Sequence, residues 1–91
     1  MVKRVALASK LDTAAAPELR KSLIEMQDED LVLDGSEVKM IGALCVETLM
    51  SVAAVWNNGG HSVTIEDASP EMIEDLGRLG LTPDTLLENA A

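Results

Sequence analysis

The sequence has almost no aromatic residues: Trp56 is the only one among 91, and Phe and Tyr are absent. Nucleic-acid modules that stack bases on aromatic rings are therefore excluded. The core must be built from Leu, Val, Ile, Ala and Met, and we expect Trp56 to lie in it. A hydrophobic fraction of 47% with 25% charged residues is ordinary for a folded protein. The length predicts one domain over residues 1–91.

Basic residues are also scarce: 7 Lys and Arg stand against 16 Asp and Glu, a net charge of −9. A nucleic-acid backbone or an anionic membrane surface would repel such a chain, so we expect neither as a partner. The imbalance is uneven, because residues 40–91 contain eight acids and only Arg78 as a base. Two interpretations stay open: a polarised surface that steers a basic partner, or a charge that only keeps the protein soluble.

Cysteine and histidine occur once each, as Cys45 and His61. No intrachain disulfide can form, which fits the reducing cytoplasm, where we expect the protein to be located. The pair cannot supply a zinc site or a catalytic triad, so we expect no metal, no cofactor, no catalytic residue and no enzymatic activity. Cys45 is either a thiol activated by a helix N-terminus or a small buried residue. No apolar run is long enough for a signal peptide or a membrane helix.

Turn signals divide the chain into alternating strands and helices. In chain order we expect a strand over 4–9, a helix from 13 that ends before 27, a strand over 31–33, a helix over 43–56, a strand over 61–65, a helix over 70–79 and a short helix from 83. This alternation predicts an α/β fold with a mostly parallel sheet and right-handed crossovers. The wholly apolar segment 31–33 is typical of a central strand covered on both faces. Binding is expected at the loops beyond the carboxyl ends of the strands.

The loop from Asp34 to Gly42 is the most informative of these. A buried strand ends at Asp34, and both Asp34 and Ser36 can accept hydrogen bonds from nearby amides. The helix that follows starts with Gly42, Ala43 and Leu44 and leaves its first backbone amides free. Such a segment can display a hydroxyl for phosphorylation, dock a protein, or serve only as a structural loop, and the residues alone leave these three open.

Several motifs follow one another at a spacing that resembles a known family. They are Leu-Asp-Thr-Ala-Ala-Ala-Pro-Glu-Leu-Arg at 11–20, Leu-Val-Leu-Asp-Gly-Ser at 31–36, Gly-Ala-Leu-Cys at 42–45, Asn-Gly-Gly at 58–60, Ser-Pro at 69–70 and Leu-Gly-Leu at 79–81. Over residues 4–87 the chain resembles the STAS domain, named for sulphate transporters and anti-sigma factor antagonists. The resemblance implies a small parallel or mixed sheet with helices packed mainly on one face.

The resemblance also implies a docking surface made by the loop 34–43 and the first turns of the next helix. The partner-binding residues carried over are Asp12, Asp34, Ser36, Gly42, Ala43 and Leu44. Of these, Asp34 and Ser36 are expected to shape the loop, and Ala43 and Leu44 to contact a partner. Anti-sigma factor antagonists are phosphorylated on a Ser or Thr in this turn, but residues 42–45 contain no hydroxyl. We therefore expect no phosphorylation there, with Ser36 as a remote candidate.

With a glycine-rich, Cys-containing turn and no serine, the chain is similar to the small STAS proteins that are encoded beside bacterial chemotaxis kinases. The resemblance therefore implies a non-enzymatic protein–protein interaction module that regulates bacterial signalling by binding a kinase, either a chemotaxis histidine kinase or one of related ATPase fold. One alternative is an anti-sigma factor antagonist that binds an anti-sigma factor kinase in a partner-switching system. Another is a small-molecule carrier or a STAS subunit associated with lipid transport.

Overall fold

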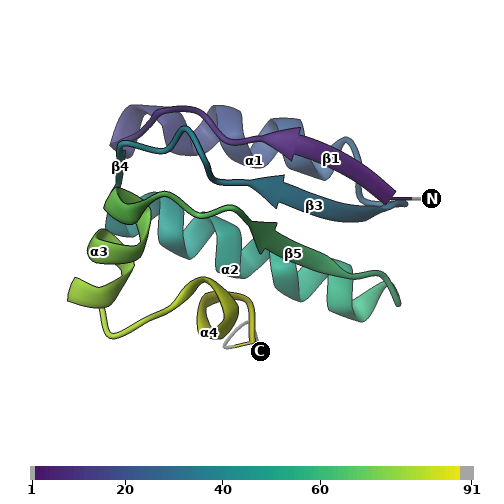
Figure 1. Cartoon of the computed structure of the whole chain (residues 1–91). Helices are drawn as coiled ribbons and strands as arrows, with labels where there is room; N and C mark the ends of the chain where they lie inside the picture. The colour runs from purple at the N-terminus through teal and green to yellow at the C-terminus, as the bar shows by residue number, and fades with distance from the viewer. Residues whose placement is uncertain (1, 89–91) are drawn as a thin grey trace.

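Three parallel strands form the main sheet of the computed structural model, which describes residues 2–88. They are β1 (Val2–Ala6), β3 (Asp30–Asp34) and β5 (Val63–Glu66), with β3 in the middle (Figure 1). The register places Arg4, Val32 and Thr64 side by side across the three strands. All carboxyl ends therefore meet at one edge of the sheet, as the alternation of strands and helices predicts.

The helices are α1 (Ala16–Ile24), α2 (Ala43–Asn58), α3 (Pro70–Arg78) and α4 (Pro83–Glu88), with a short 3-10 turn, η1 (Thr13–Ala15), before α1. Figure 1 shows α1 and α2 behind the sheet, with α3 and α4 beside its β5 side. The expected α/β class with helices mainly on one face is confirmed. Every strand pairing is parallel.

A second, two-stranded sheet was not predicted. It pairs β2 (Lys10–Leu11) with β4 (Met40–Ile41), two segments that lie between the strands and helices expected from the sequence. Leu11 and Ile41 are both buried, and the Gly42 amide donates to the Leu11 carbonyl at 2.9 Å, which extends the pairing toward α2. The first strand also begins earlier and ends sooner than expected, because the chain leaves the main sheet after the Leu7 amide donates to the Asp34 carbonyl.

The central strand β3 is covered on one face only. Leu31 and Leu33 point to the helices and are buried, whereas Val32 points to the other face and is half-buried. The prediction of cover on both faces is therefore wrong. The physical reason is that Arg4 lies on the open face next to Val32 and pairs with acids at the ends of β3 and β5, so polar side chains replace a second layer of helices.

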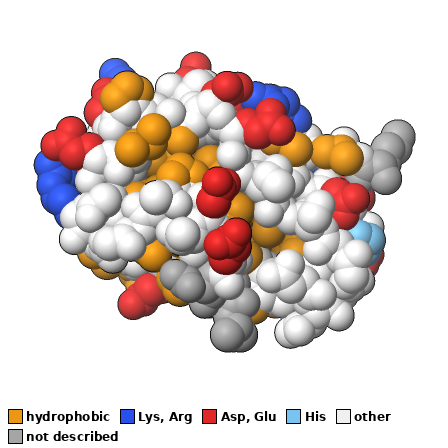
Figure 2. Space-filling model, turned by 60° about the horizontal axis from the view of Figure 1, so that its bottom comes forward, with side chains coloured by type: hydrophobic (Ala, Val, Ile, Leu, Met, Phe, Trp, Pro, Cys, Tyr) orange, Lys and Arg blue, Asp and Glu red, His pale blue; other side chains and the backbone are white. Residues whose placement is uncertain are grey.

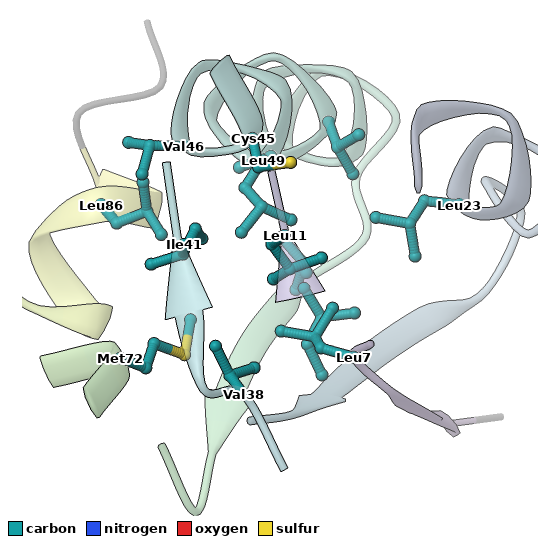
Figure 3. Close-up of a cluster of buried hydrophobic side chains, with 14 of the residues drawn as sticks. Leu7, Leu11, Leu23, Val38, Ile41, Cys45, Val46, Leu49, Met72 and Leu86 are labelled. Carbon is teal, nitrogen blue, oxygen red and sulfur yellow. The ribbon is translucent and has the colours of Figure 1, made fainter. Parts of the chain in front are cut away.

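The hydrophobic core lies between the sheet and α2 and is almost purely aliphatic (Figure 3). Leu7, Leu11 and Leu49 meet at its centre. Trp56 is fully buried, as predicted, and its indole Nε1 donates to the Glu29 carbonyl at 2.7 Å. This bond satisfies the one polar atom of the ring, so the tryptophan can be buried without an unpaired donor.

Side chains cap the N-termini of two helices. The Asp12 carboxylate caps η1 by accepting from the Ala15 amide at 3.1 Å. The Ser69 hydroxyl caps α3 by accepting from the Met72 amide at 3.1 Å, with Pro70 in the first helical position. Both arrangements satisfy amides that would otherwise have no partner in the helix.

Candidate functional site: the docking loop and helix tip

The residues expected to bind a partner gather at the carboxyl edge of the strands, on the left of Figure 1. Asp34 ends β3, Asp12 follows β2, and Gly42 joins β4 to α2. We call residues 34–42 the docking loop, and Gly42, Ala43 and Leu44 the helix tip. Parallel pairing brings these parts to one end of the molecule although they are far apart in the sequence.

The helix tip presents apolar atoms and no hydroxyl. Gly42 is the N-cap of α2 but has no side chain to bond the first amides, and its carbonyl accepts from Val46 at 3.1 Å. Ala43 is exposed, and Leu44 leaves 42% of its surface open. The first hydroxyl of α2 belongs to Thr48, which donates to the Leu44 carbonyl at 2.9 Å. The tip is thus a small exposed aliphatic surface.

Asp34 and Ser36 fix the start of the docking loop. The Ser36 amide donates to Asp34 Oδ1 at 2.9 Å, and the Arg4 guanidinium lies 3.4 Å from Asp34 Oδ2. The hydrogen bonds from Ser36, together with the charge of Arg4, lower the pKa of Asp34. The Ser36 side chain is exposed. Asp34 therefore shapes the loop, and Ser36 lies on its surface.

Arg4 lies on the open face of the sheet and forms ion pairs beside the start of this loop. Its guanidinium donates to Glu66 Oε1 and to Asp67 Oδ2, each at 3.0 Å, in addition to its contact with Asp34. The hydrogen bond that Arg4 donates to Glu66 is the main reason why the pKa of Arg4 is raised. One cation on β1 thus holds together the carboxyl ends of β3 and β5.

Asp12 and Cys45 join the first turn of the chain to α2. The Cys45 thiol donates to the Asp12 carbonyl at 3.3 Å and is fully buried. Burial, and secondarily the charge of Asp12, raises the pKa of Cys45. A buried thiol with a raised pKa is a poor nucleophile, so the buried interpretation of Cys45 holds.

Helix α3 holds the docking loop at two points that sequence reasoning missed. The buried Ser69 hydroxyl donates to the Val38 carbonyl, and the Ser69 amide donates to the Gly35 carbonyl at 3.0 Å. Further along α3, Asp75 Oδ2 accepts from the Ile41 amide at 3.0 Å. Nothing in the sequence signals these contacts, which span 31 and 34 residues.

Two hollows lie near these elements. An apolar one of about 230 Å³ runs between β1 and α1 past Val5 and Leu19, and it is smaller than the roughly 300–1,000 Å³ usual for ligand pockets. A second, of about 460 Å³, is lined by Ser36 and Lys39 of the docking loop and by Glu71 of α3. His61 lies at the other end of the sheet, 3.5 Å from Asp30 Oδ1 by its Nδ1. Within residues 2–88, no three His, Cys, Asp or Glu side chains are grouped to hold a metal ion.

This arrangement defines the class of the protein: a small α/β module with an exposed loop and helix tip at the carboxyl edge of a parallel sheet. The STAS_2 family model, described as "Mlab, STAS domain", matches residues 2–88, and the chain belongs to this family. STAS domains are generally non-catalytic interaction modules, of the type found in signalling and in anti-sigma factor antagonists. Comparison with curated proteins gave no match. Among residues 2–88, no helix has both the length and the apolar character needed to cross a bilayer.

Proposed function

We propose that this protein is a non-catalytic regulatory module of bacterial signalling that acts in the cytoplasm by binding a kinase. The partner is a chemotaxis histidine kinase or a kinase of related ATPase fold. The observation that supports this most is the helix tip, where Ala43 and Leu44 are exposed and no hydroxyl can accept a phosphoryl group. A tip of this kind favours constant binding of the partner, and not binding that is switched by phosphorylation.

Leu44 contributes part of the binding energy at this contact. Full burial of a leucine side chain contributes about 1.5–3 kcal/mol, and Leu44 is already about half covered, so the remaining gain is roughly 1 kcal/mol. An aspartate in its place would have to lose its hydration at the same contact. Leu44→Asp should therefore weaken kinase binding by about tenfold or more.

The net charge of −9 adds a second, long-range contribution. It speeds the approach of a basic partner surface, and this effect falls as salt screens the charges. Without a phosphoacceptor at the tip, control of the complex comes from the abundance or the conformational state of the partner.

The test is a calorimetric titration of the purified kinase with the wild-type chain and with Leu44→Asp. Val2→Asp is the matched control, since Val2 is 63% exposed and begins β1 at the opposite end of the sheet. We expect Leu44→Asp to weaken binding and Val2→Asp to leave it unchanged. Equal binding by both variants, or tight binding to a lipid-transporter ATPase and none to the kinase, would contradict the proposal.

The exposed hydroxyl of Ser36 supports a second candidate, an anti-sigma factor antagonist in a partner-switching system. Its test is incubation with an anti-sigma factor kinase and ATP, followed by mass spectrometry of wild type and of Ser36→Ala. A phosphate that is present on wild type and absent from Ser36→Ala would favour this candidate over constant docking.

A further inference from the structure

Strand β1 is an edge of the main sheet, because only β3 pairs with it. The Leu7 amide donates to the Asp34 carbonyl, so the odd-numbered residues of β1 turn their amides and carbonyls toward β3. The main-chain groups of Arg4 and Ala6 therefore point away from the sheet, and no atom of residues 2–88 is hydrogen-bonded to them. A row of unpaired amides and carbonyls of this kind is a template for an added strand.

The opposite edge of the main sheet is covered. Helix α4 packs against β5, and Leu86 of this helix is fully buried. Figure 2 looks onto this side of the molecule, where hydrophobic side chains lie among acids. At the other edge, α1 lies behind β1 (Figure 1), and a hollow lies between the two. Within residues 2–88, the β1 edge is therefore the one that another strand can reach.

An apolar hollow of about 230 Å³ adjoins these unpaired main-chain groups, and we call it the β1 hollow. It is lined by Val5, Ala6 and Leu7 on one side and by Leu19 of α1 on the other. Val5 lies on the helix side of the sheet, in register with the buried Leu33. Successive side chains of a strand point to opposite faces, so every second residue of an added strand would turn toward the hollow. The lining suits an aliphatic side chain at such a position.

Charges of opposite sign lie at the two ends of the β1 hollow. Lys3 precedes Val5 by two residues and shares its side of the sheet, at the amino end of β1. Glu18 lines the hollow from the first turn of α1, together with Leu7 at the carboxyl end of the strand. Lys3 and Glu18 are exposed, and neither forms an ion pair within residues 2–88. An added strand therefore meets an unpaired cation at one end and an unpaired anion at the other.

We propose that the β1 edge binds an extended segment of a partner protein, which adds to the sheet as a fourth strand. On the side that faces the helices, alternate residues of this segment are a base, an aliphatic residue and an acid. The aliphatic side chain enters the β1 hollow beside Val5, the base pairs with Glu18, and the acid pairs with Lys3. Main-chain bonds to Arg4 and Ala6 hold the segment in place. This site is separate from kinase docking at the helix tip, because it uses different residues.

The position of α1 favours a single segment over a second copy of this chain. Figure 1 shows α1 behind β1. If two copies paired through their β1 strands about a twofold axis, their α1 helices would come to about the spacing of neighbouring strands, roughly 4.8 Å. Packed helices need about 8–10 Å between their axes. An extended segment adds no helix of its own at this place, so it avoids the clash.

The test is nuclear magnetic resonance of the whole isotope-labelled chain, titrated with the capped peptide Thr-Lys-Thr-Val-Thr-Glu-Thr and with the reversed sequence. The two peptides present the same side chains to an antiparallel and to a parallel added strand, and at least one should bind. Amide shifts should centre on β1 and α1. Binding should weaken at least tenfold when Asp replaces the peptide's Val, or when the peptide amides that face β1 are methylated. No binding by either peptide, or shifts centred elsewhere, would overturn the proposal.

Variants of the chain separate this site from the helix tip. Ala6→Pro removes an outward amide, which a sheet edge tolerates, and should weaken peptide binding at least tenfold. Ala6→Val keeps the amide and should bind like wild type, and so should Leu44→Asp. Circular dichroism verifies that each variant is folded.

An exchange of charge gives a second measurement that does not depend on proline. Glu18→Lys should weaken binding of the peptide, and replacing the peptide's Lys with Glu should restore it. Equal binding by wild type and Ala6→Pro would contradict the proposal, and so would the absence of any restoration. Dimerisation of the wild-type chain that Ala6→Pro abolishes would also overturn it, because the occupant would then be a second copy.

Discussion

Replacing Ser69 with alanine removes one buried hydroxyl that serves two hydrogen bonds. The Ser69 hydroxyl caps α3 by accepting from the Met72 amide, and it donates to the Val38 carbonyl in the docking loop. Ser69 is the only polar residue among those buried within residues 2–88, so water cannot readily take over these bonds. The substitution therefore loosens α3 and the docking loop together.

The cost of Ser69→Ala can be worked from these two bonds. Loss of an N-cap hydroxyl costs about 1 kcal/mol. Leaving the Val38 carbonyl without a partner in the interior adds about 1–3 kcal/mol. The sum, about 2–4 kcal/mol, is a large part of the roughly 5–15 kcal/mol that stabilises a typical domain. For a chain of this size, the melting temperature should fall by roughly 8 °C or more.

Urea unfolding followed by the fluorescence of Trp56 measures this directly, because Trp56 is the only aromatic residue and is fully buried. The matched control is Ser51→Ala, which changes an exposed serine of α2 and should alter the free energy of unfolding by less than about 0.5 kcal/mol. Hydrogen exchange should also quicken at the Val38 and Ile41 amides of the docking loop. A loss of stability for Ser69→Ala no larger than the control's would refute the reasoning.

Three further predictions concern single side chains. Trp56→Ala should cost about 3–5 kcal/mol in urea unfolding followed by circular dichroism, because it empties part of the core and leaves the Glu29 carbonyl without its donor. Cys45 should react slowly with a thiol reagent at neutral pH and quickly in urea, since burial raises its pKa and blocks access; fast labelling of the native chain would contradict this. The pKa of Asp34 is lowered in the folded chain, so its contribution to stability is present above the unfolded value of about 3.9 and is lost as the pH falls further. Urea midpoints between neutral and acidic pH should therefore fall more for wild type than for Asp34→Asn.

Local signals predicted much of the fold. Ser69 and Pro70 mark the start of α3, and Asp12 marks η1, because capping and a proline at the first helical position depend only on neighbouring residues. The long apolar periodicity up to Trp56 likewise predicts that α2 is the main helix of the core. The same reasoning placed the start of the helix at residue 43, where α2 does begin, with Gly42 as its N-cap.

What the sequence could not predict depends on contacts between distant residues. The strands β2 and β4 have two residues each, too few for any alternation to appear. The apolar run 31–33 suggested cover on both faces, but Arg4, from another strand, takes the place of a second layer. The support that Asp75 gives to the Ile41 amide has no local signature, because it requires α3 to be packed against β4 first.

Gly42 has a consequence for how such a module could change during evolution. Its backbone is extended, at φ −96° and ψ 169°, and an added Cβ would meet only the Leu11 carbonyl oxygen, at an ordinary 3.7 Å. Serine fits this conformation and is a preferred N-cap residue, so Gly42→Ser should leave the fold intact. A change in one codon would place a hydroxyl at the N-terminus of α2, where a kinase could phosphorylate it and a phosphatase could remove the phosphate.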